Sequence, residues 1–88
     1  MKVKVLFFAV IRDMVGAREI EWEGPEGATV GQLNRDLVAR FPQISGLARV
    51  LSLAVNAEYA DESTTLRAGD EVALIPPVSG GRRLQSSS

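Results

Sequence analysis

The sequence contains no cysteine and no histidine. The missing cysteines exclude disulfides, thiolate metal sites and a thiol nucleophile on this chain. The missing histidines remove the usual general base and the commonest metal ligand. An enzyme acting alone would have to rely on Asp, Glu, Lys, Arg, Ser or Thr, so the composition argues against an independent hydrolase and predicts no metal site.

Long apolar runs are also missing. No run approaches the roughly 18 residues that a membrane helix needs, so no membrane span is expected. The apolar start of the chain is short and ends at Arg12-Asp13, which favours a strand over a signal peptide. With 88 residues, of which 45% are hydrophobic and 24% charged, the chain is typical of one soluble globular domain.

Lysine is scarce, since Lys2 and Lys4 are the only two in the chain. The formal net charge is −1, and it becomes −3 without Arg82 and Arg83, because eleven acidic residues then face eight basic ones. A mildly acidic domain of this kind argues against nucleic-acid binding. It is compatible with docking on a basic partner surface.

Alternating apolar residues predict several strands. Residues 2–9 form a first strand with a core face of Val3, Val5 and Phe7, and residues 18–23 form a second with Ile20 and Trp22 inward. Further along, we expect a strand over 51–55, a short strand at 59–60 and a last strand over 71–75. In the last strand Val72 and Leu74 point inward, and Ala73 and Ile75 point outward.

One strong helix is expected over residues 30–41. Thr29 and Gln32 have the spacing of a capping box, an apolar stripe follows at helical spacing, and Pro42 ends the helix. Residues 10–15 fit one or two helical turns that stop at Gly16, and residues 43–50 a short turn in which Ile44, Leu47 and Val50 could cover the core. The order of elements predicts an α+β fold: a mixed sheet of four to five strands with one main helix on one face.

The acidic pairs Asp61-Glu62 and Asp70-Glu71 are the first candidates for acid–base chemistry. Both lie in predicted turns, where acidic residues are common, so we interpret them as turn residues. Glu19, Glu21 and Glu23 alternate along the second strand and are interpreted as its solvated face.

The last strand runs directly into Pro76-Pro77, followed by Val78-Ser79-Gly80-Gly81. The two prolines end the backbone hydrogen bonding of the strand and favour a stiff, extended segment. The two glycines after them give this segment an end without side chains. This arm suits insertion into a narrow channel, although a Gly-Gly pair can also begin a plain linker.

An apolar patch is expected at the base of this arm. Leu6 and Phe8 on the first strand and Ala73 and Ile75 on the last face away from the core, and they meet if the two strands are neighbours. Tyr59 lies at the rim. The patch predicts a docking surface, unless a loop of the chain covers it.

Four stretches of the sequence resemble one family: Val5-Leu6-Phe7-Phe8-Ala9, Arg12-Asp13-Met14-Val15-Gly16, Gly69-Asp70-Glu71-Val72-Ala73 and Pro76-Pro77-Val78-Ser79-Gly80-Gly81. They are similar to the small subunits of molybdopterin synthases, the MoaD-type branch of the MoaD/ThiS sulfur carriers, over residues 2–81. The resemblance implies a β-grasp, ubiquitin-like fold in a cytoplasmic, non-catalytic sulfur donor. The thiamine-pathway carrier and a ubiquitin-like interaction or modifier module remain the alternatives.

The resemblance also implies the chemistry. An E1-like enzyme adenylates the carboxylate of Gly81 with ATP and magnesium, a sulfurtransferase supplies sulfur, and the resulting thiocarboxylate enters the large synthase subunit and donates its sulfur to precursor Z. Gly80 lets the backbone lie in a tunnel, and the chain itself binds no cofactor. Phe8, Tyr59 and Ile75 match the family's docking positions, and the predicted partner surface consists of Leu6, Phe8, Tyr59, Ala73, Ile75, Pro76, Pro77, Val78 and Ser79.

The resemblance divides the chain into a carrier domain, residues 1–81, and an unfolded extension, residues 82–88. Family members end at the second glycine, whereas a peptide bond to Arg82 leaves Gly81 without a carboxylate to adenylate. The extension can be a segment added for expression, a propeptide cleaved after Gly81, or the start of a truncated fusion. The residues Arg82-Arg83-Leu84-Gln85 and the three serines after them have no folding logic, which favours the first explanation.

Overall fold

The computed structural model describes residues 1–77; residues 78–88, which include the predicted site residues Val78, Ser79, Gly80 and Gly81, lie outside the described part. The described chain contains two α-helices, one 3₁₀-helix and five strands. In order they are β1 (Lys2–Phe7), α1 (Ala9–Val15), β2 (Glu19–Glu23), α2 (Val30–Arg40), η1 (Pro42–Leu47), β3 (Ser52–Val55), β4 (Glu58–Ala60) and β5 (Glu71–Ile75).

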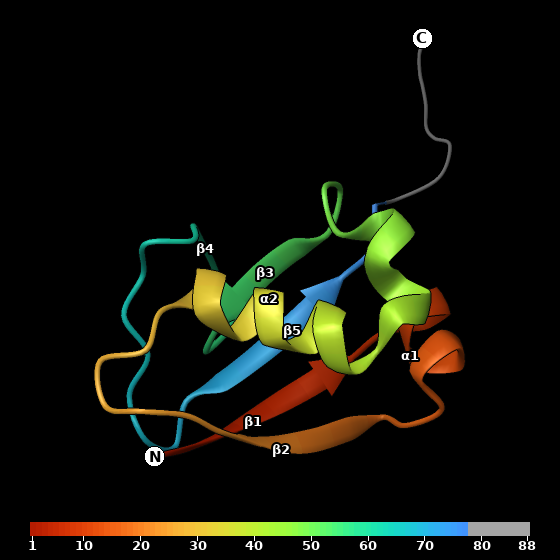
Figure 1. Ribbon diagram of the computed structural model, residues 1–88. Coiled ribbons are helices and arrows are strands. Elements are labelled where there is room, and N and C mark those ends of the chain that lie inside the picture. The colour runs from red at the N-terminus through yellow and green to blue at the C-terminus, as the bar shows by residue number, and fades with distance from the viewer. Residues whose placement is uncertain (78–88) are drawn as a thin grey trace, which may run out of the picture.

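The five strands form one mixed sheet in the order β2-β1-β5-β3-β4, and α2 crosses one face of it (Figure 1). The central strands β1 and β5 are parallel, whereas the other pairs are antiparallel. The first and last strands are therefore neighbours, as the patch prediction required. The α+β prediction of four to five strands with one main helix on one face is confirmed.

The core lies between α2 and one face of the sheet. The inward residues of β1 and β5 are almost fully buried, as predicted, and Leu33 and Leu37 of α2 pack against them. Leu66, in the loop before β5, is also buried at 2% exposure. Among residues 1–77, neither α-helix is long and apolar enough to cross a membrane.

The predicted helix boundary at Thr29 is confirmed. The Thr29 hydroxyl accepts a hydrogen bond from the backbone N–H of Gln32, and the Gln32 side chain accepts one from the backbone N–H of Thr29, which together form a capping box. The helix ends at Arg40, one residue earlier than predicted, and Phe41 packs edge-on against Phe7 with ring centroids 5.9 Å apart.

The first strand is shorter than predicted, because it ends at Phe7 and the chain turns at once into α1. Ala9 makes this turn with a φ of 49°, in the left-handed region. The predicted helical turns before Gly16 are confirmed, and Gly16 ends α1 with a φ of 83°. Val50 was expected to cover the core, but it is 51% exposed beyond the end of η1.

The other strand boundaries shift slightly. The second strand begins at Glu19 instead of Arg18, and the third begins at Ser52 instead of Leu51. The short fourth strand pairs back on β3 as expected and gains one residue, Glu58.

Candidate functional site

Four residues form a straight row across the face of the sheet that α2 does not cover. Leu6 of β1 is opposite Ala73 of β5, Ala73 is opposite Ala54 of β3, and Ala54 is opposite Tyr59 of β4. Because side chains alternate between the two faces of a strand, these four point to the same side. The two alanines lie in the middle, so the row is low at its centre and high at both ends.

The two alanines form the floor of an open hollow of about 290 Å³, called here the docking hollow, and Leu6 and Tyr59 lie at its two sides. Its lining contains all five residues of the predicted apolar patch, and it adds three that were not predicted. The full set is Leu6, Phe8, Ala54, Ala57, Tyr59, Glu71, Ala73 and Ile75. Among the described residues, no loop closes the hollow into a core, so the structure brings the predicted patch together on an accessible surface.

Phe8 lies at the end of β1 rather than on it. Its backbone is extended and precedes the first turn of α1, where its carbonyl accepts hydrogen bonds from the N–H groups of Ile11 and Arg12. A strand on one side and a helix on the other therefore fix the backbone of Phe8, and the residue is 45% exposed. On the opposite rim Tyr59 is 77% exposed, just after the β3–β4 turn.

The root of the arm lies at the edge of the docking hollow. β5 ends at Ile75, which is paired with Ser52 of β3, and Pro76 is half-buried while Pro77 is exposed. The end of β5 is close to α1 (Figure 1). The predicted roles of Gly80 and Gly81, and those of Val78 and Ser79, fall outside the described residues and stay predictions.

Asn56 ties the β3–β4 turn to the start of β5. Its side-chain oxygen accepts from the N–H of Glu71 at 3.0 Å, its side-chain nitrogen donates to Asp70 Oδ1 at 3.0 Å, and its own N–H donates to the carbonyl of Glu71 at 2.8 Å. These bonds hold Ala57 and Glu71 beside the hollow. No local sequence pattern indicates this role of Asn56, because the role depends on the pairing of β3 with β5.

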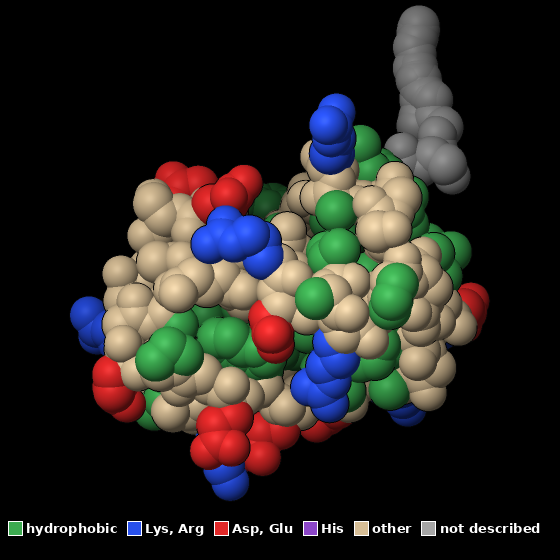
Figure 2. Space-filling view, in the orientation of Figure 1, with side chains coloured by type: hydrophobic (Ala, Val, Ile, Leu, Met, Phe, Trp, Pro, Cys, Tyr) green, Lys and Arg blue, Asp and Glu red, His purple; other side chains and the backbone are tan. Residues whose placement is uncertain are grey.

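Asp61 and Asp70 serve turns in the structure, whereas Glu71 is the first residue of β5 and so does not lie in a turn. Asp61 Oδ1 accepts from the hydroxyl and the N–H of Ser63 and from the hydroxyl of Thr64. The hydrogen bond from the Ser63 hydroxyl, with smaller help from the other donors, lowers the pKa of Asp61 below its ordinary value. Within residues 1–77 no group of three acidic side chains is placed to hold a metal ion. Seen from the α2 side, charges of both signs are scattered over the surface (Figure 2).

Comparison with known proteins gives the family. The model of the ThiS family matches residues 5–81. The molybdopterin synthase sulfur carrier subunit of Arabidopsis thaliana is 36% identical over 92% of this chain and 84% of its own length.

Solved structures agree with this assignment. SAMP1 (small archaeal modifier protein 1) of Haloferax volcanii matches with a TM-score of 0.80 and 31% identity, over 92% of this chain and 100% of that one. A complex of subunits 1 and 2 of the molybdopterin-converting factor from Helicobacter pylori contains a chain that matches with a TM-score of 0.70 and 27% identity, over 92% and 100%.

Ubiquitin of Caldiarchaeum subterraneum shares the fold alone, with a TM-score of 0.63 and 23% identity over 92% and 98% of the two chains. The predicted β-grasp, ubiquitin-like fold is thereby confirmed. The family match and the curated relative cover nearly the whole described domain. This chain belongs to the MoaD/ThiS family of sulfur carriers.

Proposed function

We propose that this chain is the sulfur-carrier subunit of a molybdopterin synthase and that it works in the cytoplasm, where ATP for its activation is available. The relatives between 33% and 41% identical carry that subunit's name. The observation that carries the proposal is the accessible docking hollow directly at the root of the arm. The arm begins at the edge of this hollow, so a partner bound to the hollow has the first residues of the arm directly beside it.

The reacting group in this proposal is the carboxyl of Gly81. A carboxylate is a poor acyl donor, so an E1-like enzyme first joins it to AMP: a carboxylate oxygen attacks the α-phosphorus of magnesium-bound ATP, and pyrophosphate leaves. Hydrosulfide (HS⁻) released by a sulfurtransferase then attacks the acyl carbon, AMP leaves, and loss of the thiol proton follows without any change of oxidation state. The product is a thiocarboxylate, and Gly81 presents it without a Cβ in the way.

This chain is then a donor and supplies no catalytic side chain or cofactor. Catalysis belongs to the activating enzyme and to the large synthase subunit, where the thiocarboxylate gives its sulfur to precursor Z. The chemistry requires a free carboxylate, so the active form ends at Gly81. The Helicobacter pylori complex of subunits 1 and 2 supports a large-subunit partner for this chain.

The docking step has a direct test. A tagged large subunit should capture the wild-type chain and lose it when Phe8→Ala removes the rim of the hollow or Ile75→Arg places a charge at the root of the arm. Glu21→Gln is the matched control, because Glu21 is exposed on the edge strand β2 and does not line the hollow. Capture of both hollow variants at wild-type levels would show that the partner binds elsewhere.

A ubiquitin-like modifier is the second candidate, because the chain is 31% identical to SAMP1. The same arm would then form an isopeptide bond, and Gly81 would be found linked to lysines of other proteins. Such conjugates from the native host would favour this candidate. A thiamine-pathway carrier has less support, since the named relatives are molybdopterin synthase subunits.

A further inference from the structure

The strand β2 forms one end of the sheet, and no other described element lies beyond it (Figure 1). On its inner side Arg18 and Phe7 are a hydrogen-bonded pair, since the Phe7 N–H donates to the Arg18 carbonyl at 2.9 Å. Bonded and unbonded pairs alternate in an antiparallel ladder, so Ile20 and Trp22 are the next residues that bond to β1. The residues between them direct their backbone N–H and C=O groups outward. They are Glu19, Glu21 and Glu23.

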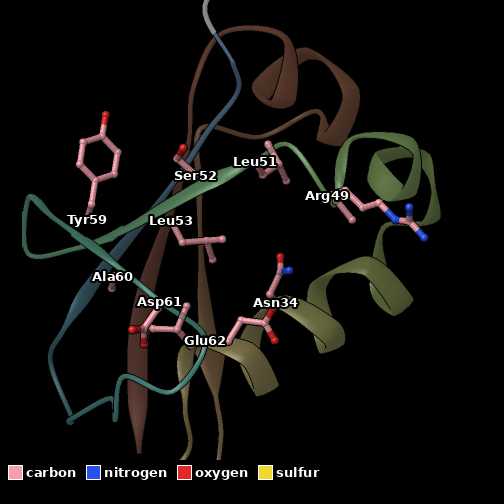
Figure 3. Close-up of a pocket in the computed structure, with 11 residues that line it drawn as sticks. Asn34, Arg49, Leu51, Ser52, Leu53, Tyr59, Ala60, Asp61 and Glu62 are labelled. Atoms are coloured by element: carbon pink, nitrogen blue, oxygen red, sulfur yellow. The ribbon is translucent and has the colours of Figure 1, made fainter.

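The other end of the sheet is less open. β4 has only three residues, and the chain after it is bonded to the start of α2. The Gly31 N–H donates to the Glu62 carbonyl at 3.0 Å, and the Val30 N–H donates to the Thr64 carbonyl at 2.9 Å. Figure 3 shows this segment, with Glu62, beside α2. Within residues 1–77, the five residues of β2 therefore offer the longer free edge.

The three residues with outward backbone groups are all acidic. Glu19, Glu21 and Glu23 are exposed, and they lie on the face that α2 does not cover, because each is opposite an outward residue of β1. Glu21 Oε1 is 3.7 Å from Lys2 Nζ, but these side chains are 66% and 63% exposed, so the pair is weak. In the described part of the chain, Glu19 and Glu23 make no ion pair. The free edge therefore combines unpaired backbone groups with a row of carboxylates.

We propose that the free edge of β2 binds an extended segment of a partner protein in which basic residues alternate with apolar ones. The segment adds to the five-stranded sheet as a further strand, antiparallel to β2, and bonds to the three outward peptide groups. Its Lys or Arg side chains lie opposite the three glutamates. Its apolar side chains lie on the α2 side, next to Ile20, which is half-buried and already packs against the core.

A second copy of this chain does not fit this edge. Antiparallel pairing of two β2 strands about a twofold axis at Glu21 would place Glu21 opposite itself and Glu19 opposite Glu23. Like charges directly opposite each other destabilise a strand pair. The glutamates therefore oppose self-association and favour a basic segment. None of the three lines the docking hollow, so the proposal does not depend on sulfur transfer.

The test uses NMR spectra of the full-length, ¹⁵N-labelled chain titrated with a peptide of alternating lysine and valine, acetylated and amidated at its ends. We expect saturable shifts at the backbone amides of Glu19, Glu21 and Glu23. Hydrogen exchange at these amides should slow about tenfold or more, because each N–H gains an acceptor. Methylation of the peptide's lysine backbone nitrogens keeps the charge and removes the donors, so it should weaken binding about tenfold or more.

Equal binding of the two peptides would overturn the proposal, because charge alone would then explain the attraction. Shifts without slower exchange at the three glutamate amides would overturn it as well, since no strand would have been added. Absence of any shift with the unmethylated peptide would have the same consequence.

Variants separate strand addition from general charge effects. Glu21→Lys should weaken the peptide about tenfold or more, whereas Glu58→Lys, the same change at an exposed position of β4, should leave binding unchanged. Glu21→Pro removes an outward N–H and no bond to β1, so it should also reduce binding. Glu21→Lys keeps the test decisive if Glu21→Pro does not fold. Equal affinities of the two lysine variants would contradict the proposal.

Discussion

Leu6 and Ala73 are direct partners on the parallel strands β1 and β5, and this pairing joins the beginning of the chain to its last strand. Ala73 is two residues before the end of β5, so the pairing also places the root of the arm next to the apolar face of β1. Because Ala73 and its other partner, Ala54, are small, the sheet is shallow at this point. The docking hollow is a direct consequence of this register.

Filling the hollow should block docking without unfolding the chain. Ala73→Arg introduces a bulky side chain on the open face, and Ala73→Gln does so without charge. We expect both to weaken binding of the large subunit by roughly thirtyfold or more, as for a central interface residue. Calorimetric titration gives the affinity, and a melting temperature close to the wild-type value confirms that the fold is intact. Wild-type affinity in both variants would show that the hollow is not the interface.

The β3–β4 turn carries backbone strain that a glycine should relieve. Asn56 and Ala57 have φ values of 50° and 71°, which is the pattern of a turn that favours Asn-Gly. Ala57→Gly should therefore stabilise the domain by about 1 kcal/mol. Ala39→Gly, at an exposed position inside α2, should have the opposite effect of about 1 kcal/mol. Urea unfolding of both variants tests this; a loss of stability in Ala57→Gly would contradict the account of the turn.

The indole of Trp22 connects the edge strand β2 to α2. Its Nε1 donates to Asp36 Oδ2 at 2.7 Å, and the ring is only 5% exposed. Asp36→Ala leaves this donor without its carboxylate and should cost about 1.5 kcal/mol. In the Trp22→Phe background, which lacks the donor, Asp36→Ala should cost little. Thermal unfolding of the four proteins measures the coupling, and a coupling of zero would mean that the bond contributes nothing.

The lowered pKa of Asp61 predicts a specific pH dependence. Its folded-state pKa lies below the ordinary value of 3.8 because Ser63 and Thr64 donate to the carboxylate. The stabilisation is therefore complete above 3.8 and is lost as the pH falls through the folded-state pKa. Asp61→Asn should be less stable than wild type at neutral pH, and the difference should vanish in acid. Parallel unfolding curves at pH 7 and pH 2 test this, and an unchanged difference would contradict it.

Local patterns were sufficient for much of the fold. The capping box at Thr29 and Gln32 depends only on residues three apart, and the alternation around Ala73 depends only on the pleat of one strand. Both were predictable because neighbouring residues determine them. The neighbouring placement of β1 and β5 was a condition of the patch prediction, and the topology meets it.

Other features depend on contacts between distant segments. Ala9 turns the chain out of β1 with a left-handed φ although it is not a glycine, so no sequence signal marked the end of the strand. Ala54 lines the hollow only because β3 is paired with β5. Leu66 is buried in a loop that has no periodic pattern.

The central claim is that Gly81 carries sulfur as a thiocarboxylate. The most direct measurement is the intact mass of a chain that ends at Gly81, after incubation with its E1-like enzyme, a sulfurtransferase with its sulfur source, and magnesium-ATP. Replacement of one carboxylate oxygen by sulfur predicts a gain of about 16 Da, and omission of ATP should abolish it. An unchanged mass in the presence of an activating enzyme that demonstrably consumes ATP would contradict the account.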